Sequence, residues 1–364
     1  MYKLSLPWIY NNKLDGIFIL CPPFICLLII FLFPSVFNNA KEINTVSWVV
    51  LILLVDVAHV YSTLYRTYFD REALTRWPIL FKYVPIMAWM FFAFLYSLGA
   101  IMFWRTLAYL AVFHFIRQQY GFLRIYSRKD NLSATARLIE TITIYSATIY
   151  PLIYWHFSSD RNFNWFMDGD FVSFKVPHVL QVSRYIYLLI LLCYVINEAG
   201  LIIKTKKFNL PKNLIVTGSA LSWYFGIVYF NGDMAFTTLN VISHGVPYMA
   251  LIWAYGRKKY YPPNPPADYK RPLVSRLFSL RNISLFLIIL FVFAFIEEGL
   301  WDGLIWNDHR HVFWIFHSLP SVNDNRLLAL LIPLLALPQI THYILDGFIW
   351  KISKDKSLKV LSEK

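Results

Sequence analysis

The sequence predicts an all-α membrane protein, a polytopic transmembrane helical bundle of about ten spans. Of its 364 residues, 58% are hydrophobic, 19% are aromatic and only 15% are charged. A soluble globular domain is closer to half apolar and a quarter charged. A span needs about 20 mostly apolar residues, and the stretches that qualify are 15–37, 44–65, 83–99, 100–120, 137–157, 179–203, 213–231, 236–256, 282–300 and 327–350.

The basic residues indicate how these spans are oriented. The net charge is +13, and most Lys and Arg fall in segments that lie inside if the N-terminus is inside. This positive-inside pattern places both termini inside, in what we expect to be a bacterial inner (plasma) membrane. The charge therefore predicts contact with anionic phospholipid at the inner face. We expect no nucleic-acid partner, because no nucleic-acid-binding module is recognisable.

The segments between the spans complete one predicted integral membrane domain, residues 1–364. Segments 157–177 and 301–326 are rich in aromatic residues, so we expect them to cap the outer surface. Segment 257–281 is basic and proline-rich, which predicts an extended inner linker. The three cysteines lie in apolar spans without a CxxC pair, so no disulfide framework is expected: Cys21, Cys26 and Cys193.

Histidines and carboxylates recur at similar depth in five of the predicted spans. Ionisable side chains inside a membrane are costly and are usually functional. Counting back from the inner basic flank of each span, at about 1.5 Å per residue, places most of them in the inner half of the bilayer. These candidate metal ligands are His59, His114, His244, His342, Asp56, Glu198 and Asp346.

Each of these residues also has a simpler interpretation. A lone intramembrane histidine often hydrogen-bonds to a neighbouring helix, and Glu198 could extend to the interface. Asp56 and Asp346 lie three or four residues from a histidine, so each could form a local pair with it. As members of a metal site, these two carboxylates are either ligands or groups that orient the histidine. The agreement in depth across five helices favours a shared site, with three amides as candidates to support its ligands: Gln118, Asn197 and Asn240.

The residue types in this set predict the metal. Neutral imidazoles and carboxylates without thiolates are ligands of iron, zinc or manganese, and we expect iron. One ion with carboxylates around its ligands, or two ions bridged by carboxylate, would use the same residues. A separate outer group is either a surface metal site or a solvated loop: Asp308, His309, His311 and His317.

The segment THYILD, with His342 and Asp346, and the segment VFHFIRQQ, with His114, resemble motifs of the Brp/Blh-type membrane carotene dioxygenases. His342 and Asp346 in THYILD match a His-x-x-x-Asp element, and His114 in VFHFIRQQ matches an apolar His-Phe element. A Val-Pro-His element has loose counterparts in VPHVL, at His178, and in SHGVPY, at His244. The elements occur here in a different order, with His-x-x-x-Asp last. The resemblance implies iron bound by intramembrane histidines and a lipophilic substrate, without implying carotene.

The principal hypothesis is a membrane-embedded, metal-dependent oxidoreductase or oxygenase. Its substrate would be a lipid or another lipophilic small molecule that enters from the bilayer, and an electron donor would be a further partner. The first alternative is a proton-coupled or metal-ion transporter that uses the intramembrane His, Asp and Glu side chains. The second is a b-type haem protein in which two facing histidines bind the haem iron.

Overall fold

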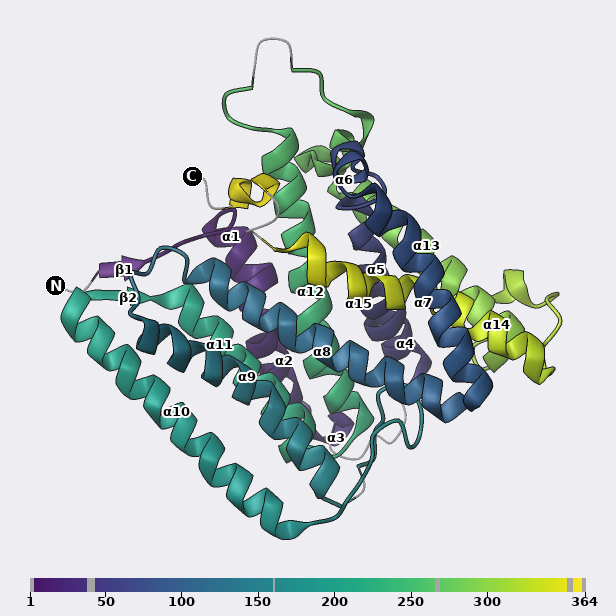
Figure 1. Ribbon diagram of the computed structural model, residues 1–364, viewed down its shortest axis with the longest axis horizontal. Helices are drawn as coiled ribbons and strands as arrows, with labels where there is room; N and C mark the ends of the chain where they lie inside the picture. The colour runs from purple at the N-terminus through teal and green to yellow at the C-terminus, as the bar shows by residue number, and fades with distance from the viewer. Residues whose placement is uncertain (1–2, 38–42, 160, 266–268, 352–355, 362–364) are drawn as a thin grey trace. The chain divides into compact units, whose positions relative to one another are not determined.

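The chain folds almost entirely into helices, as the sequence predicts (Figure 1). The computed structural model describes residues 3–37, 43–159, 161–265, 269–351 and 356–361. Within these residues, four helical segments are long and apolar enough to cross a membrane, and two bent helix pairs raise the number to six if each is one span. The segments are Thr45–Tyr65, Pro78–Leu98, Pro177–Thr205 and Leu280–Trp306, and the bent pairs are Asn12–Leu20 with Pro22–Leu32 and Asn325–Leu335 with Leu337–Ile349.

The other four predicted spans are also helical, but they do not meet the same measure of length and apolarity. They form α8 (Ala100–Tyr126), α9 (Ala134–Phe157), α11 (Leu210–Trp223) with its π-helical continuation (Tyr224–Tyr229), and α12 (Asp233–Tyr260). The prediction of an all-helical chain with several helices suited to a multi-pass membrane protein is therefore confirmed. One small exception was not expected, a parallel pairing of β1 (Lys3–Ser5) with β2 (Lys207–Asn209).

The described helices belong to two compact units. Unit 1 contains Met1–Ile43 and Phe115–Pro247, and unit 2 contains Asn44–His114 and Tyr248–Glu363. The divisions at 114/115 and 247/248 fall within α8 and α12, so each of these helices contributes to both units.

Unit 1 is built around α9, which packs against both α11 and α10 (Pro177–Thr205) (Figure 1). Capping side chains fix where two of these helices begin, because Ser133 and Asn209 accept backbone N–H groups of the first turns of α9 and α11. At its N-terminal end the unit has α1 (Asn12–Leu14), a π-helix (Asp15–Leu20), α2 (Pro22–Leu32) and α3 (Pro34–Phe37).

A buried lysine links the three large helices of unit 1. Lys212 on α11 is 2% exposed, and its Nζ lies 2.8 Å from Glu140 Oε1 on α9 and 2.7 Å from Glu198 Oε1 on α10. The nearby Asp130 carboxylate lies 3.4 Å from the same Nζ, and Arg124 donates to Glu140 over 2.8 Å. Because a buried charge is tolerated only when it is paired, this network fixes how the helices pack.

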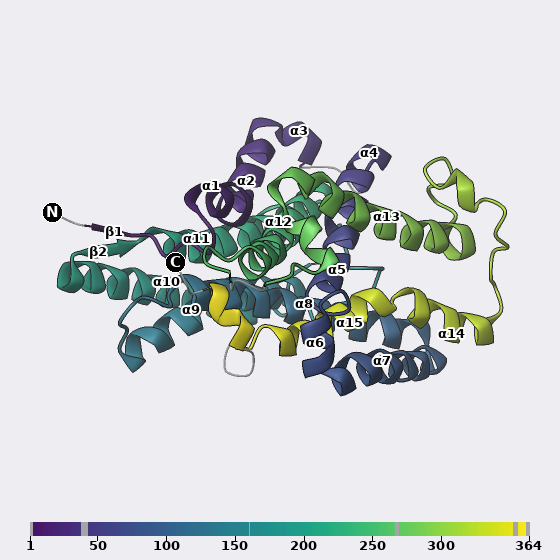
Figure 2. The same ribbon diagram turned by 90° about the horizontal axis from the view of Figure 1, so that it is seen from above.

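Unit 2 begins with a continuous helical segment made of α4 (Thr45–Trp48), a π-helix (Val49–Val57), α5 (Ala58–Ser62) and a 3-10 turn (Thr63–Tyr65). α7 (Pro78–Leu98) packs against both members of the bent pair, α14 (Asn325–Leu335) and α15 (Leu337–Ile349) (Figure 2). The remaining elements are α6 (Arg71–Arg76), α13 (Ile283–Trp301), a π-helix (Asp302–Trp306) and 3-10 turns at Leu273–Phe278, Leu280–Asn282, Trp314–Phe316 and Lys356–Leu361.

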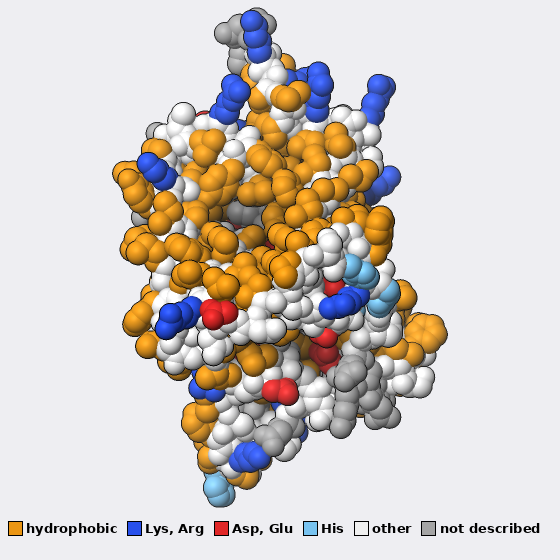
Figure 3. Space-filling model, turned by 90° about the vertical axis from the view of Figure 1, so that its right-hand side faces the viewer, with side chains coloured by type: hydrophobic (Ala, Val, Ile, Leu, Met, Phe, Trp, Pro, Cys, Tyr) orange, Lys and Arg blue, Asp and Glu red, His pale blue; other side chains and the backbone are white. Residues whose placement is uncertain are grey.

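The outer faces of α7 and α13 are apolar. Ile79, Met87 and Phe94 on α7 and Ile288 and Val292 on α13 are each more than half exposed. Apolar side chains also dominate the upper part of the face in Figure 3, with Lys and Arg side chains at its upper edge. An apolar surface of this kind suits lipid, because in water it would favour aggregation.

The predicted loops are partly ordered by local hydrogen bonds. In the 157–177 segment, the Asp170 carboxylate accepts backbone N–H groups of Trp165 and Phe166 at 2.9 and 2.7 Å. Burial raises the pKa of Asp170, and these N–H groups partly oppose the rise because they stabilise the charged form. The predicted linker 257–281 begins helical, since α12 continues to Tyr260. Residue 160 and residues 266–268 of these segments lie outside the described residues.

The Lys212 network leads to a prediction about stability. Replacing Lys212→Met should lower the free energy of unfolding by about 3–5 kcal/mol, because Glu140 and Glu198 would lose their buried counter-charge. Reversible unfolding in mixed micelles, followed by circular dichroism, measures the change. The matched control is Lys204→Met, at an exposed position of α10, which should change stability by less than about 0.5 kcal/mol. Equal stabilities for the two variants would contradict the prediction.

Candidate metal centre

Three buried histidines of unit 2 come together from three helices. His59 on α5, His114 on α8 and His342 on α15 are 1%, 3% and 1% exposed. Each offers one ring nitrogen, and these nitrogens lie within 4.8 Å of one another. The ring centroid of His342 lies 5.1 Å from that of His59 and 4.4 Å from that of His114. Imidazole nitrogens gathered on this scale could hold a metal ion.

Local features of the backbone place each histidine. His59 follows directly on the π-helix Val49–Val57, and π-helical turns occur frequently at functional sites. His342 follows the bend of 45° between α14 and α15. His114 lies on α8, which is separated from α7 by Gly99 at φ +147°, a conformation that favours glycine. The break at Gly99 lets two helices with almost no connecting loop take different directions.

A chain of hydrogen bonds fixes the orientation of His342. Its Nδ1 lies 2.7 Å from Thr63 Oγ1, which lies 2.9 Å from the Tyr248 hydroxyl. Tyr248 donates to Asp346 Oδ1 over 2.6 Å. An ionised carboxylate only accepts, so with Asp346 charged Tyr248 uses its proton on Asp346 and accepts the proton of Thr63. Thr63 can then only accept from His342, which places the His342 proton on Nδ1.

The consequence is that the other nitrogen of His342 keeps its lone pair. Nε2 is buried and has no hydrogen-bond partner among the residues that the structure describes. A buried polar atom without a partner costs about 1–3 kcal/mol. A neutral imidazole with Nδ1–H bound to the protein and Nε2 available is the usual form of a metal-binding histidine.

The two aspartates of unit 2 lie beside histidines. Asp346 Oδ1 is 3.8 Å from His342 Nδ1, and its Oδ2 is 3.8 Å from His114 Nδ1. Asp56 Oδ1 is 3.7 Å from Nδ1 of His59. In each pair the carboxylate faces the ring nitrogen Nδ1. These distances are longer than hydrogen bonds, so whether the aspartates bind the metal or orient the histidines stays a prediction.

His244 belongs to the part of α12 in unit 1. It is 1% exposed, and its ring stacks on that of Phe115 with centroids 3.5 Å apart. The predicted supporting residue Gln118 donates to the main-chain oxygen of His244 over 2.9 Å. Asn240, one turn earlier on α12, donates to the main-chain oxygen of Phe236. His244 and Tyr248 are four residues apart on one continuous helix, so they share a face.

The structure gives Glu198 different partners from those that a metal ligand would have. Its two carboxylate oxygens bind Lys212 and Asn213, at 2.7 and 3.0 Å. Metal binding by Glu198 would require both contacts to break. The neighbouring Asn197 has a buried Nδ2 without a hydrogen-bond partner among the described residues.

The outer histidines do not form a comparable group among the described residues. The ring of His309 lies tilted against that of Trp48 with centroids 4.2 Å apart, and the His309 backbone N–H donates to Asp302 over 2.6 Å. Partial burial lowers the pKa of His309, although the Asp302 charge opposes this. His317 contacts the main-chain oxygen of Arg310. These contacts describe a folded outer loop, and a metal role for it stays a prediction.

Thr63 and Tyr248 were not among the residues that the sequence pointed to. Thr63 lies four residues after His59, and Tyr248 lies four residues after His244, so helical spacing could have indicated both. Glu297 on α13 was also missed, although it is a carboxylate within a predicted span and is 4% exposed.

No known protein family matches the chain, and neither a curated protein nor a solved structure is detectably similar to it. The function of the centre therefore has to be inferred from its own residues.

The hydrogen bond between Thr63 and His342 gives a testable prediction. Thr63→Val keeps the shape of the side chain but removes the acceptor, so the tautomer of His342 is no longer fixed. We expect metal affinity to fall about 10–100-fold, the usual effect of losing a group that orients a ligand. Titration of the metal-free protein with ferrous iron measures the affinity.

Two further variants make the test specific. Thr63→Ser retains the hydroxyl and should restore most of the affinity, and Thr75→Val, at an exposed position of α6, should leave it unchanged. Wild-type affinity in Thr63→Val would show that Thr63 does not support a metal ligand.

Proposed function

We propose that the chain is a membrane-embedded metalloenzyme in which buried histidines bind iron and a lipophilic substrate is oxidised. The observation that carries this proposal is His342, whose Nδ1 is engaged by Thr63 while its buried Nε2 has no partner among the described residues. His59 and His114 bring two more ring nitrogens within 4.8 Å. Leaving such a polar atom buried and unsatisfied is costly, and a metal would satisfy it.

We extend the proposed ligand set to His244. It lies one turn before Tyr248 on the same face of α12, and the Tyr248 ring centroid is 5.0 Å from that of His342. His244 is also buried, as a ligand in a membrane-embedded centre should be. Four imidazoles form a complete set for one ion, whereas two ions would need bridging carboxylates as ligands.

The dimensions of the group suit a bound metal. Metal–nitrogen bonds of about 2.0–2.1 Å in a tetrahedron place ligand nitrogens roughly 3.3 Å apart. The nitrogens of His59, His114 and His342 lie within 4.8 Å of one another, so small side-chain movements would bring them into range. Imidazole ligands suit iron, zinc and manganese, and among these iron would supply oxidative chemistry when bound.

The protein side chains would have two tasks in this reaction. Thr63, Tyr248 and Asp346 would hold the ligand tautomer, and the buried surroundings of the histidines would exclude water from the reacting groups. The exposed apolar faces of α7 and α13 support a substrate that arrives from the bilayer.

The finer membrane topology is part of the same proposal. We propose about ten spans that cross a bacterial plasma membrane, with both termini on its inner side, because the basic segments alternate with the apolar ones. The inner segments would contact anionic phospholipid. An unidentified electron donor remains a proposed partner. The resemblance to the Brp/Blh-type carotene dioxygenases also remains a proposal.

One observation favours a transporter as the second candidate. Glu297 on α13 is 4% exposed, and its Oε1 accepts from Gln339 over 3.5 Å. Buried carboxylates inside a span are typical of proton and cation pathways. A haem protein is less well supported, because the rings of His114 and His342 touch edge to face and leave no space for a flat macrocycle between them.

The metal content of the purified protein tests the proposal. We expect about one iron per chain after reconstitution in detergent, and loss of most of it in His342→Ala. The same loss is expected for the alanine variants of His59, His114 and His244. His178→Ala is the control, because His178 is exposed at the start of α10. Elemental analysis of folded, monodisperse samples gives the stoichiometry.

The alternatives make different predictions in the same experiment. If the wild-type protein folds but cannot be loaded with metal, the proposal of a metalloenzyme is contradicted. An absorption band of haem would favour the haem protein. Metal-dependent proton or cation flux in proteoliposomes, without oxygen consumption in the presence of lipid extracts, would favour the transporter.

A further inference from the structure

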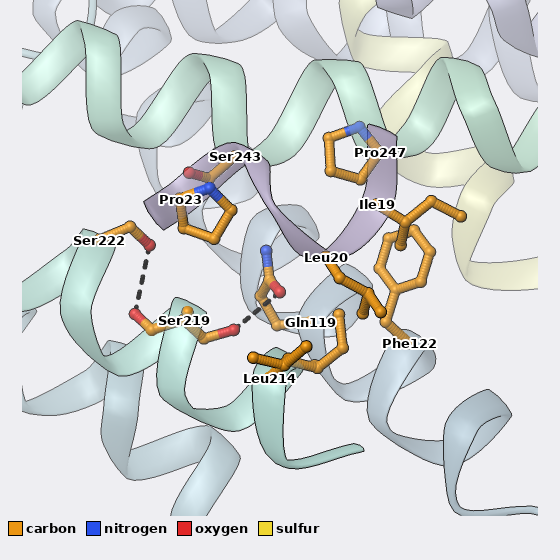
Figure 4. A pocket seen from close by; sticks show the side chains of 12 residues that line it. Ile19, Leu20, Pro23, Gln119, Phe122, Leu214, Ser219, Ser222, Ser243 and Pro247 are labelled. Atoms are coloured by element: carbon orange, nitrogen blue, oxygen red, sulfur yellow. Dashed lines mark hydrogen bonds between the residues drawn. The ribbon is translucent and has the colours of Figure 1, made fainter. Parts of the chain in front are cut away.

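Unit 1 contains a narrow pocket whose lining includes none of the proposed metal ligands. It lies between the first bent helix pair, α8, α11 and α12, and its polar wall carries Gln119, Ser219, Ser222 and Ser243 (Figure 4). Apolar side chains, among them Leu20, Phe122 and Leu214, form the rest of the lining, the apolar wall. None of the lining residues is charged, so the pocket suits a neutral ligand.

The polar wall carries hydrogen-bond donors. Gln119 is 7% exposed, and its Oε1 accepts from Ser219 Oγ over 2.8 Å. In Figure 4 the Gln119 nitrogen points towards the space below Pro23. Ser243 is 8% exposed, and its hydroxyl lacks a partner among the described residues. A buried hydroxyl without a partner, as at Ser243, indicates that something else hydrogen-bonds to it.

The size of the pocket limits what can enter. The space among the lining side chains holds about one water-sized group. A ligand can therefore place only one small oxygen-bearing end there, with its adjoining carbons against the apolar wall. Two donors and no charge favour a carbonyl oxygen, which accepts two hydrogen bonds.

We propose that this pocket binds the carbonyl end of a neutral lipid, such as a long-chain ketone or aldehyde, through Gln119 Nε2 and the Ser243 hydroxyl. Ser243 and Pro247 line the pocket on either side of His244 along α12. This inference rests on the proposed function in one respect, since it names a neutral carbonyl lipid as the class of substrate that the metal centre would receive; the binding step forms and breaks no covalent bond. Binding itself needs no metal.

The experiment uses the full-length, metal-free protein in a maltoside detergent with carbonyl-labelled ¹³C 2-tridecanone as the probe. Infrared spectroscopy measures the C=O stretch, which moves to lower frequency when the oxygen accepts hydrogen bonds. With the wild type, we expect 2-tridecanone to give a C=O band at lower frequency, whose intensity saturates as the ketone concentration rises. Tridecane and dodecanoate should compete poorly, because one lacks an acceptor and the other carries a charge.

Two variants and a control separate the pocket from general partitioning. Gln119→Leu should weaken binding at least about tenfold and reduce the shift, because the N–H donors are lost. Leu214→Trp should block binding by filling the pocket while keeping Gln119. Gln181→Leu, at an exposed position of α10, should behave like the wild type.

Each outcome decides the proposal. An unshifted or non-saturable band, or equal binding of tridecane, would overturn it and leave the pocket as a site for water only. Equal binding by the wild type and both pocket variants would also overturn it. Iron content measured on the same preparations distinguishes the lipid-binding proposal from the metalloenzyme proposal. If protein that cannot take up iron still binds the ketone, the lipid site is supported, but its role as the substrate site is contradicted.

Discussion

The hydrogen bond from His342 Nδ1 to Thr63 is the interaction on which the metal centre depends. In the apolar interior between packed helices, both ring nitrogens of a histidine need hydrogen-bond partners. A nitrogen left without a partner there costs free energy of folding. Tyr248 and Asp346 extend the bond into a chain that runs in one direction when Asp346 is ionised. The chain converts an ambiguous imidazole into one with a defined proton position, and it is built from residues on three separate helical segments.

The Lys212 network of unit 1 and the Thr63–Tyr248–Asp346 chain of unit 2 use buried polar groups in opposite ways. In unit 1, Lys212 has its charge matched by Glu140 and Glu198, so the network is closed and holds helices together. In unit 2, the polar chain ends at a nitrogen for which no described residue is a partner. A closed network is expected of a structural element, whereas an open one is expected where a ligand completes the set.

The sequence was sufficient for the fold class, because the apolar stretches and the few charges leave little choice other than membrane helices. It also identified His59, His114 and His342, since a shared depth restricts which side chains can meet. The sequence could not show that Glu198 has a different partner from these histidines. Glu198 pairs with Lys212, which lies on another helix, and only the packing of the helices brings the two together. Bends at Gly99 and Ala336 and the roles of Thr63 and Tyr248 likewise depend on tertiary contacts that periodicity does not encode.

X-ray absorption spectroscopy of the iron-loaded protein tests the central claim most directly. Scattering beyond the first ligand shell distinguishes imidazole rings from carboxylates and water. We predict the multiple scattering of at least three imidazoles bound to one iron, from His59, His114 and His342, with a fourth if His244 is a ligand. A first shell of oxygen atoms without imidazole scattering would contradict the account.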